Sequence, residues 1–126
     1  MRYPEKLILA TTIKAQRTDI EKLRQKGVDV ILTKSKKGMV DLEDLMKYLG
    51  KRELMSIMIE GGSELNSSAI KAGIVDKILM FAAPKLIGNG LGAIGNLGID
   101  KINKAINLRN QVVKKIGKDV FVEAYI

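Results

Sequence analysis

Apolar runs that suit buried strands alternate along most of this chain with segments that carry the 3.6-residue spacing of helices. Up to Pro84 the order is strand, helix, strand, helix, strand, helix, strand, and each connection is short enough for a right-handed crossover between parallel strands. We expect the strands at residues 6–12, 28–33, 54–59 and 75–83, and the helices at 18–26, 42–49 and 63–72. This alternation predicts an α/β fold of three layers, in which helices cover both faces of a mainly parallel sheet.

The character of the sequence changes after Pro84. Five of the 12 glycines fall between Gly88 and Gly98, and two further strands are expected at 105–116 and 119–126. These two strands, joined at Gly117-Lys118, are expected to form an antiparallel hairpin at the edge of the sheet. A length of 126 residues suits a single domain over residues 1–126 and is enough to bury a core.

Two of the expected helices begin with recognisable capping residues. Thr18 and Glu21 have the spacing of a capping box, and Gly27 is placed to end the same helix. Asp41 is a good N-cap for the next helix, and Gly50 lies just past its expected end.

The composition excludes several kinds of chemistry. Because the chain has no cysteine and no histidine, it cannot contain a disulfide framework, a thiolate nucleophile, a zinc finger or a histidine general base. We expect no metal site. No apolar run reaches 18 residues, and residues 1–6 lack the features of a signal peptide, so we expect a cytoplasmic protein with no membrane partner.

The formal net charge of +8 raises the question of an anionic partner. The lysines and arginines are spread along the whole chain, and the only dense run is Lys34-Ser35-Lys36-Lys37. This run has no aromatic neighbour that could stack on a base, so we interpret it as a solvated turn and expect no nucleic-acid partner.

The strongest indication of a binding site lies between Ile57 and Asn66, where an apolar run leads into two glycines and then into a helix. Ligands of parallel α/β sheets bind beyond the carboxyl ends of strands, and the free amides of a helix start attract anions. Gly61 and Gly62 have no side chains to block a close approach, so the segment predicts a phosphate site to which Ser63 and Asn66 could add donors. The alternative is a tight turn with Ser63 as an ordinary N-cap.

Two smaller features extend this prediction. Glu60 ends the expected strand 54–59, where a carboxylate is costly unless it faces a polar cleft, so we expect it to accept hydrogen bonds from a substrate. An edge-exposed acid is the alternative. Thr11 and Thr12, with the basic residues after them, could hold the 2′-phosphate of NADP or form a solvated turn.

The segment Gly90-Leu91-Gly92-Ala93-Ile94-Gly95 matches the dinucleotide fingerprint G-x-G-x-x-G literally, but we reject that reading. The fingerprint needs a strand leading into it and a helix opening on its third glycine, whereas Pro84 and Gly98 interrupt both. A mobile or ligand-covering loop, or a plain surface loop, explains these glycines.

Three motifs in order resemble one known family. They are Ile59-Glu60-Gly61-Gly62-Ser63-Glu64-Leu65-Asn66, Lys71-Ala72-Gly73-Ile74-Val75-Asp76 and Ala83-Pro84-Lys85-Leu86-Ile87-Gly88. With the preceding alternation and the ending 117–123, they resemble the reductase domain of the bifunctional riboflavin-biosynthesis deaminase/reductase over essentially the whole chain. The resemblance implies a dihydrofolate-reductase-like fold. It also implies NADPH-dependent reduction of a phosphorylated pyrimidine substrate, 5-amino-6-(5-phosphoribosylamino)uracil, to the ribitylamino compound.

The resemblance also implies roles for particular residues. The family's substrate-contacting acid corresponds to Glu60, and Thr11 and Thr12 resemble cofactor-side residues. The family's cofactor-binding turn and helix start correspond to Gly61, Gly62, Ser63, Glu64, Leu65, Asn66, Ser67 and Ser68. No catalytic residue is named, because the cofactor carries the reduction chemistry.

One departure from the family concerns the beginning of the chain. The family's reductase domain starts well upstream, with a strand and helices that have no counterpart before Met1, and the zinc-dependent deaminase domain is absent. The resemblance therefore implies a C-terminal portion of the reductase domain that lacks the N-terminal strand or strands. Because unpaired strand edges recruit partners, we expect a homodimer. The alternative function is a non-catalytic NADP-binding or assembly module derived from the same fold.

Overall fold

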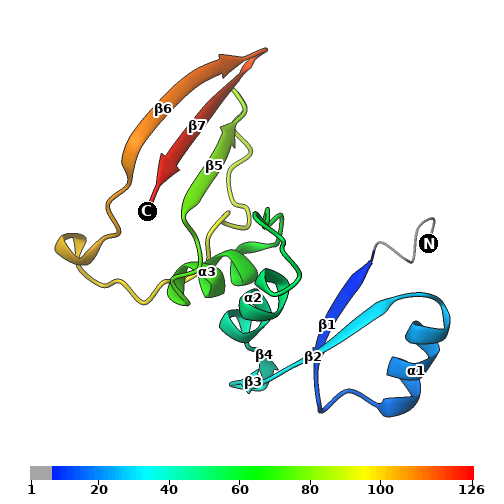
Figure 1. Cartoon of the computed structure of the whole chain (residues 1–126). Coiled ribbons are helices and arrows are strands. Elements are labelled where there is room, and N and C mark those ends of the chain that lie inside the picture. Colours follow the sequence, from blue (N-terminus) through cyan, green and yellow to red (C-terminus); the bar gives the residue numbers. More distant parts are fainter. Residues whose placement is uncertain (1–6) are drawn as a thin grey trace. The chain divides into compact units, whose positions relative to one another are not determined.

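The computed structural model describes residues 7–126, which fall into two compact units (Figure 1). One unit ends at Ile57 and the other runs from Met58 to Ile126. Lys6, the expected first residue of a strand, and the whole segment 1–6 lie outside the described residues. The single domain expected over residues 1–126 stays a prediction.

The first unit opens with a strand, a helix and a strand, as expected. β1 (Ile8–Thr12) is followed by α1 (Arg17–Gln25) and β2 (Asp29–Thr33), and the two strands pair in parallel with Thr12 opposite Thr33. The buried core of this part, against which Leu7, Leu9 and Leu23 pack, consists of Ile20, Val28 and Val30. The predicted order of strand, helix and strand is confirmed here. It is stabilised because α1 packs its apolar side chains against the strand pair.

The predicted capping box of α1 is wrong. The helix begins one residue earlier than expected, with Gln16 at the N-cap and no side-chain hydrogen bond there. The cause is the tight turn before the helix, in which the Ala15 amide bonds to the Thr12 carbonyl and brings the chain into the helix at Arg17. Thr18 therefore lies inside the first turn. Gly27 follows the helix end with φ +80, the left-handed conformation that a terminating glycine adopts.

Between β2 and the next helix the chain forms a small hairpin that the sequence did not predict. β3 (Ser35–Lys36) pairs antiparallel with β4 (Met39–Val40), and Lys37 and Gly38 between them both have positive φ. Positive φ at both central residues is the requirement of a two-residue type I′ turn. The lysine run is therefore exposed, and its last three residues belong to this hairpin and its turn.

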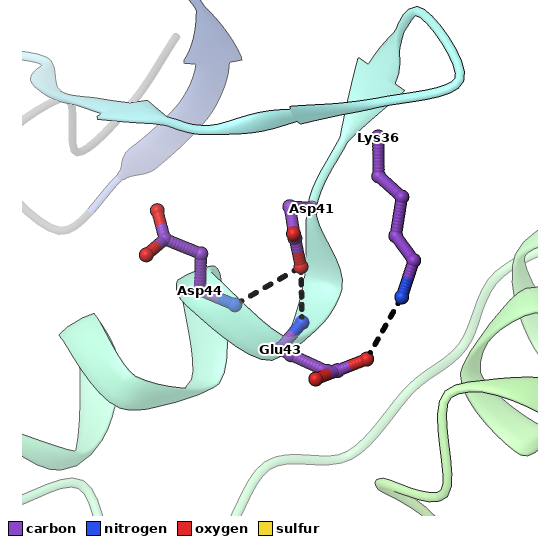
Figure 2. Close-up of polar contacts among 4 residues, drawn as sticks. All are labelled: Lys36, Asp41, Glu43 and Asp44. Atoms are coloured by element: carbon purple, nitrogen blue, oxygen red, sulfur yellow. Dashed lines mark hydrogen bonds and ion pairs between the residues drawn. The ribbon is translucent and has the colours of Figure 1, made fainter.

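α2 (Leu42–Gly50) begins as expected at Asp41. The Asp41 carboxylate accepts hydrogen bonds from the amides of Glu43 at 3.0 Å and Asp44 at 3.2 Å, which satisfies donors that the helix itself leaves free (Figure 2). Lys36 of the hairpin donates to the Glu43 carboxylate at 2.9 Å, and this bond raises the pKa of Lys36. Gly50 is the last residue of the helix and not the first beyond it.

The strand expected at 54–59 is wrong. No strand forms between α2 and residue 63, and the apolar side chains of the segment are largely exposed, with Met55 at 99% and Met58 at 69%. An apolar run forms a strand only where partner strands accept its hydrogen bonds, and no described strand pairs with this segment. Among the described strands, parallel pairing is confined to β1 and β2. The α/β class is confirmed, whereas the mainly parallel, three-layer sheet stays a prediction.

The second unit contains α3 (Ser63–Lys71), β5 (Lys77–Ala82), the short 3-10 helix η2 (Ile102–Lys104), β6 (Arg109–Ile116) and β7 (Asp119–Tyr125). The C-terminal antiparallel hairpin is confirmed as β6 and β7, which are joined at Gly117-Lys118. The sheet order is β5-β7-β6, so β7 lies in the middle and only β6 of the hairpin lies at an edge. Phe81 and Phe121 face each other across β5 and β7, with their ring centres 4.8 Å apart.

Candidate functional site

The start of α3 carries no side-chain cap. Its N-cap is Gly62, with φ −73 and ψ 176, and Ser63 is the first helical residue, so the alternative of Ser63 as an ordinary N-cap is wrong. At α2 the Asp41 carboxylate already binds the first-turn amides, whereas at α3 no side chain does. α1 also lacks a side-chain cap, but it has no glycines at its start. The first turn of α3 therefore presents amide donors and a partial positive charge to an incoming anion.

The two glycines before α3 differ in what they meet. A Cβ on Gly61 would lie 2.9 Å from the Leu65 Cβ and 3.0 Å from the Leu65 Cγ, so packing against the helix excludes a side chain there. A Cβ on Gly62 would meet nothing within 4 Å, and the φ of this residue suits any amino acid. Close packing against Leu65 therefore explains why residue 61 is a glycine. No packing contact explains the glycine at residue 62, whose backbone is accessible beside the free amides of α3.

Asn66 joins two segments that are far apart in the sequence. Its side-chain nitrogen donates to the Gly61 carbonyl at 3.2 Å and to the Ala93 carbonyl at 2.8 Å. An amide nitrogen has two hydrogens, so both are used inside the protein and neither is left for a phosphate. The expectation that Asn66 donates to the ligand therefore does not fit this geometry. The geometry fits a residue that holds the Gly61 and Ala93 backbone in place.

The glycine loop, residues 88–98, lies against α3. The Gly95 amide donates to the Ser63 carbonyl at 3.0 Å, and a Cβ on Gly95 would lie 3.0 Å from the Ser67 Oγ. No helix opens on Gly95, as we expected in rejecting the dinucleotide fingerprint. Sequence reasoning missed Ala93 and Gly95 as neighbours of the site. The density of glycines is the signal that could have indicated close packing in place of a mobile loop.

Ser67 and Ser68 follow on the same helix. Ser67 is buried and donates from its hydroxyl to the Glu64 carbonyl at 3.1 Å, and Ser68 is half-buried. Glu64 and Leu65 are exposed on the first turn. The predicted cofactor residues 61–68 are thus contiguous around one helix start, and the glycine loop, for which a ligand-covering role was one of the interpretations, lies beside them.

Glu60 lies just before this helix start, in an irregular segment and not at the end of a strand. Its side chain is exposed, so this carboxylate carries no cost of burial, and the prediction of a costly buried position is wrong. Within residues 7–126 its carboxylate makes no hydrogen bond to protein. An ionised carboxylate is a pure acceptor, which leaves Glu60 able to bind amino or hydroxyl groups.

Thr11 and Thr12 belong to the first unit, whereas Gly61 to Ser68 belong to the second. Thr12 is buried, and its hydroxyl oxygen accepts from the Lys14 amide at 3.4 Å. The buried hydroxyl of Thr33, the register partner of Thr12, lies 3.3 Å from the Thr11 carbonyl. The predicted cofactor residues therefore come from both units.

Other features of the described residues lie away from the predicted site. The part of the chain that the structure describes contains no cluster of acidic side chains suited to a metal ion, and none of its helices is long and apolar enough to cross a membrane. A cavity of about 540 Å³ in the second unit lies beyond the end of α3, with Asp76, Arg109 and Tyr125 among its lining residues. None of the predicted site residues lines it.

The fold is that of riboflavin-biosynthesis proteins. The solved structure of the RibD protein of Acinetobacter baumannii superposes with a TM-score of 0.77 at 20% sequence identity, and the match covers 97% of this chain and 31% of that protein. At this identity the likeness establishes the fold alone.

The sequence establishes the family. The profile described as the RibD C-terminal domain matches residues 2–122, and the chain belongs to this family. A riboflavin biosynthesis protein RibD from Actinobacillus pleuropneumoniae is 40% identical over 106 residues, which is 82% of this chain and 28% of that protein. The 2,5-diamino-6-ribosylamino-4(3H)-pyrimidinone 5′-phosphate reductase of Aquifex aeolicus is 30% identical over 118 residues, 92% of this chain and 52% of that enzyme. The chain thus spans less than a third of the RibD relative and about half of the separate reductase.

Proposed function

We propose that the chain is the cofactor-holding part of an NADPH-dependent reductase of riboflavin biosynthesis. Its substrate is 5-amino-6-(5-phosphoribosylamino)uracil, whose ribosyl group is reduced to ribityl. The observation that supports this proposal is the bare backbone at Gly62 beside the uncapped amides of α3. That arrangement suits the pyrophosphate of a dinucleotide, because amides at a helix start bind phosphate and the missing side chain permits close approach.

The residues have distinct tasks in this proposal. The first-turn amides of Ser63, Glu64 and Leu65 bind the pyrophosphate, and Ser67 and Ser68 support the same helix. Thr11 and Thr12 keep the cofactor role that the resemblance implies for them. When bound, NADPH supplies the hydride for the reduction. Glu60 accepts hydrogen bonds from the substrate and orients it, a role that its exposed and unpaired carboxylate permits.

A titration with NADPH tests the proposal. Binding to the 126-residue chain is followed through the cofactor's own fluorescence, and the chain has no tryptophan to interfere. The variant Gly62→Asp places at α3 the carboxylate that Asp41 provides at α2, so it caps the helix and repels the phosphate. We expect NADPH binding to weaken about tenfold or more, the equivalent of at least about 1.4 kcal/mol, while the thermal unfolding midpoint is kept.

The matched control is Asn103→Asp, which makes the same change of net charge at an exposed position in η2. It should leave NADPH binding within about twofold of the original, because Asn103 is exposed and lies outside the proposed site residues, so solvent and salt screen the added charge. Absence of NADPH binding by the unmodified chain, or equal binding by Gly62→Asp, contradicts the phosphate assignment.

One observation favours the alternative of an assembly module. β6 is an edge strand with Val113 64% and Ile116 51% exposed, and such edges pair with other chains. Sedimentation velocity with and without NADPH separates the two functions. A dimer that does not bind NADPH supports the assembly module, whereas NADPH binding by either a monomer or a dimer contradicts a purely assembling role.

A further inference from the structure

We infer that the proposed cofactor site has two walls, the start of α3 and the glycine loop. Asn66 and Gly95 are the positioning residues that hold the loop beside the helix. This inference rests on the proposed function and extends it to residues 88–98. The loop belongs to the second unit, where it runs past α3 between β5 and η2 (Figure 1). Its role follows from two independent contacts with the helix start.

The first contact is the double hydrogen bond of Asn66. One side-chain nitrogen reaches the Gly61 carbonyl at 3.2 Å and the Ala93 carbonyl at 2.8 Å, although Asn66 and Ala93 are 27 residues apart. Both carbonyl oxygens therefore lie within hydrogen-bond distance of the same atom, and the loop must pass directly beside the Gly61-Gly62 backbone. A dinucleotide bound at Gly62 would have the loop as its neighbour.

The second contact is the close packing of Gly95 against Ser63 and Ser67 of α3. Its amide bonds to the Ser63 carbonyl at 3.0 Å, and a Cβ at this position would lie 3.0 Å from the Ser67 Oγ and 3.1 Å from the Ser63 carbonyl oxygen. No positive φ is needed at Gly95, so close approach and not turn geometry explains the glycine. Gly90 in the same loop contrasts with it, because a Cβ there would meet nothing within 4 Å.

These contacts affect an anion in two ways. Carbonyl oxygens carry partial negative charge and repel a phosphate, and Asn66 holds two of them against its own amide hydrogens. The two contacts also order the loop before the cofactor arrives, so less conformational entropy is lost when NADPH binds. Asn66 therefore acts on the cofactor through the loop and not by touching it.

The test compares Gly95→Ala with Gly50→Ala, the same substitution at a tight position of the loop and at an open position outside it, the last residue of α2. Gly95→Ala should weaken NADPH binding about tenfold, and Gly50→Ala should leave it within about twofold. Asn66→Ala is the second variant, because alanine is the best helix former and keeps α3 intact. In this variant the Gly95 amide should exchange its hydrogen faster, as measured by NMR.

Inorganic pyrophosphate distinguishes positioning from general damage. The freed Gly61 and Ala93 carbonyls would repel the phosphates of both ligands, whereas the ordering of the loop affects NADPH alone, so Asn66→Ala should weaken NADPH binding more than pyrophosphate binding. An equal loss for both ligands, or unchanged NADPH binding in both Gly95→Ala and Asn66→Ala, overturns the inference while the proposed function stands. If the unmodified chain fails to bind NADPH, the proposed function is contradicted and the inference falls with it.

Discussion

Arg52 donates two hydrogen bonds to the carboxylate of Asp29, and this pair ties the segment after α2 to the first residue of β2. The Arg52 guanidinium also lies 5.1 Å above the ring of Tyr48. The hydrogen bond from Arg52 is the main cause that lowers the pKa of Asp29, and the same bond raises the pKa of Arg52. The first unit therefore contains a charge pair that responds to acid.

The Asp29–Arg52 pair predicts the direction of a pH effect. A carboxyl whose pKa is lowered by folding stabilises the fold above its unfolded pKa of about 3.9, and the stabilisation is lost as pH falls through the folded value. Arg52→Gln should therefore lower the urea midpoint at pH 6 and lower it less at pH 3. Lys22→Gln, which removes the looser pair with Asp19 at 3.8 Å, is the control and should have little effect. An Arg52→Gln effect that grows in acid contradicts the assignment.

Asp41 is predicted to stabilise α2. Asp41→Ala removes the acceptor for the Glu43 and Asp44 amides, which should cost about 1 kcal/mol of unfolding free energy in urea denaturation. Asp41→Ser keeps a capping oxygen and should recover most of that loss. If Asp41→Ser is as unstable as Asp41→Ala, the carboxylate has some role other than capping.

Gly61 and Gly62 are predicted to respond oppositely to a side chain. Gly61→Ala forces a Cβ against Leu65 and should cost about 1–3 kcal/mol of stability, as overpacked positions do. Gly62→Ser adds a side chain in open space and a favoured N-cap, so it should keep or raise the thermal midpoint. Equal midpoints for the two variants count against the close contact at Gly61.

Glu60 is predicted to bind the substrate and not the cofactor. Glu60→Gln keeps the shape of the side chain but removes its charge, which should weaken binding of the ribosylaminopyrimidine phosphate about tenfold, the loss of one charge-assisted hydrogen bond. The NADPH dissociation constant should stay within about twofold. Calorimetry with each ligand measures both values. Equal losses for the two ligands argue against the substrate role.

The parts of the fold that depend on neighbouring residues could be predicted from the sequence. Asp41 caps α2 through bonds to residues two and three positions on, and Gly27 and Gly73 adopt the positive φ that follows a helix end. The order of β1, α1 and β2 and the C-terminal hairpin also follow from local patterns. In each case the stabilising contacts lie within a few residues or across one short connection.

The parts that depend on distant partners could not be predicted. The apolar run 54–59 satisfies every local requirement of a strand, but a strand also needs another to pair with it. Gly61 and Gly62 are identical in sequence terms, and only the position of Leu65 separates them. The contact between Asn66 and Ala93 spans 27 residues, so no spacing rule indicates that the rejected fingerprint lies beside the predicted phosphate site.

The central position of β7 in the sheet of the second unit determines when that sheet can form during synthesis. β5 and β6 each pair with β7 and not with each other, and β7 follows both in the chain. During synthesis β5 therefore leaves the ribosome without a sheet partner, and β6 gains one only when the residues after Gly117 emerge. Until then the backbone edges of β5 lack the hydrogen bonds that β7 provides and can pair with other chains. A ribosome that stalls before Asp119 would leave a product with two unpaired strands, prone to aggregate and open to proteolysis.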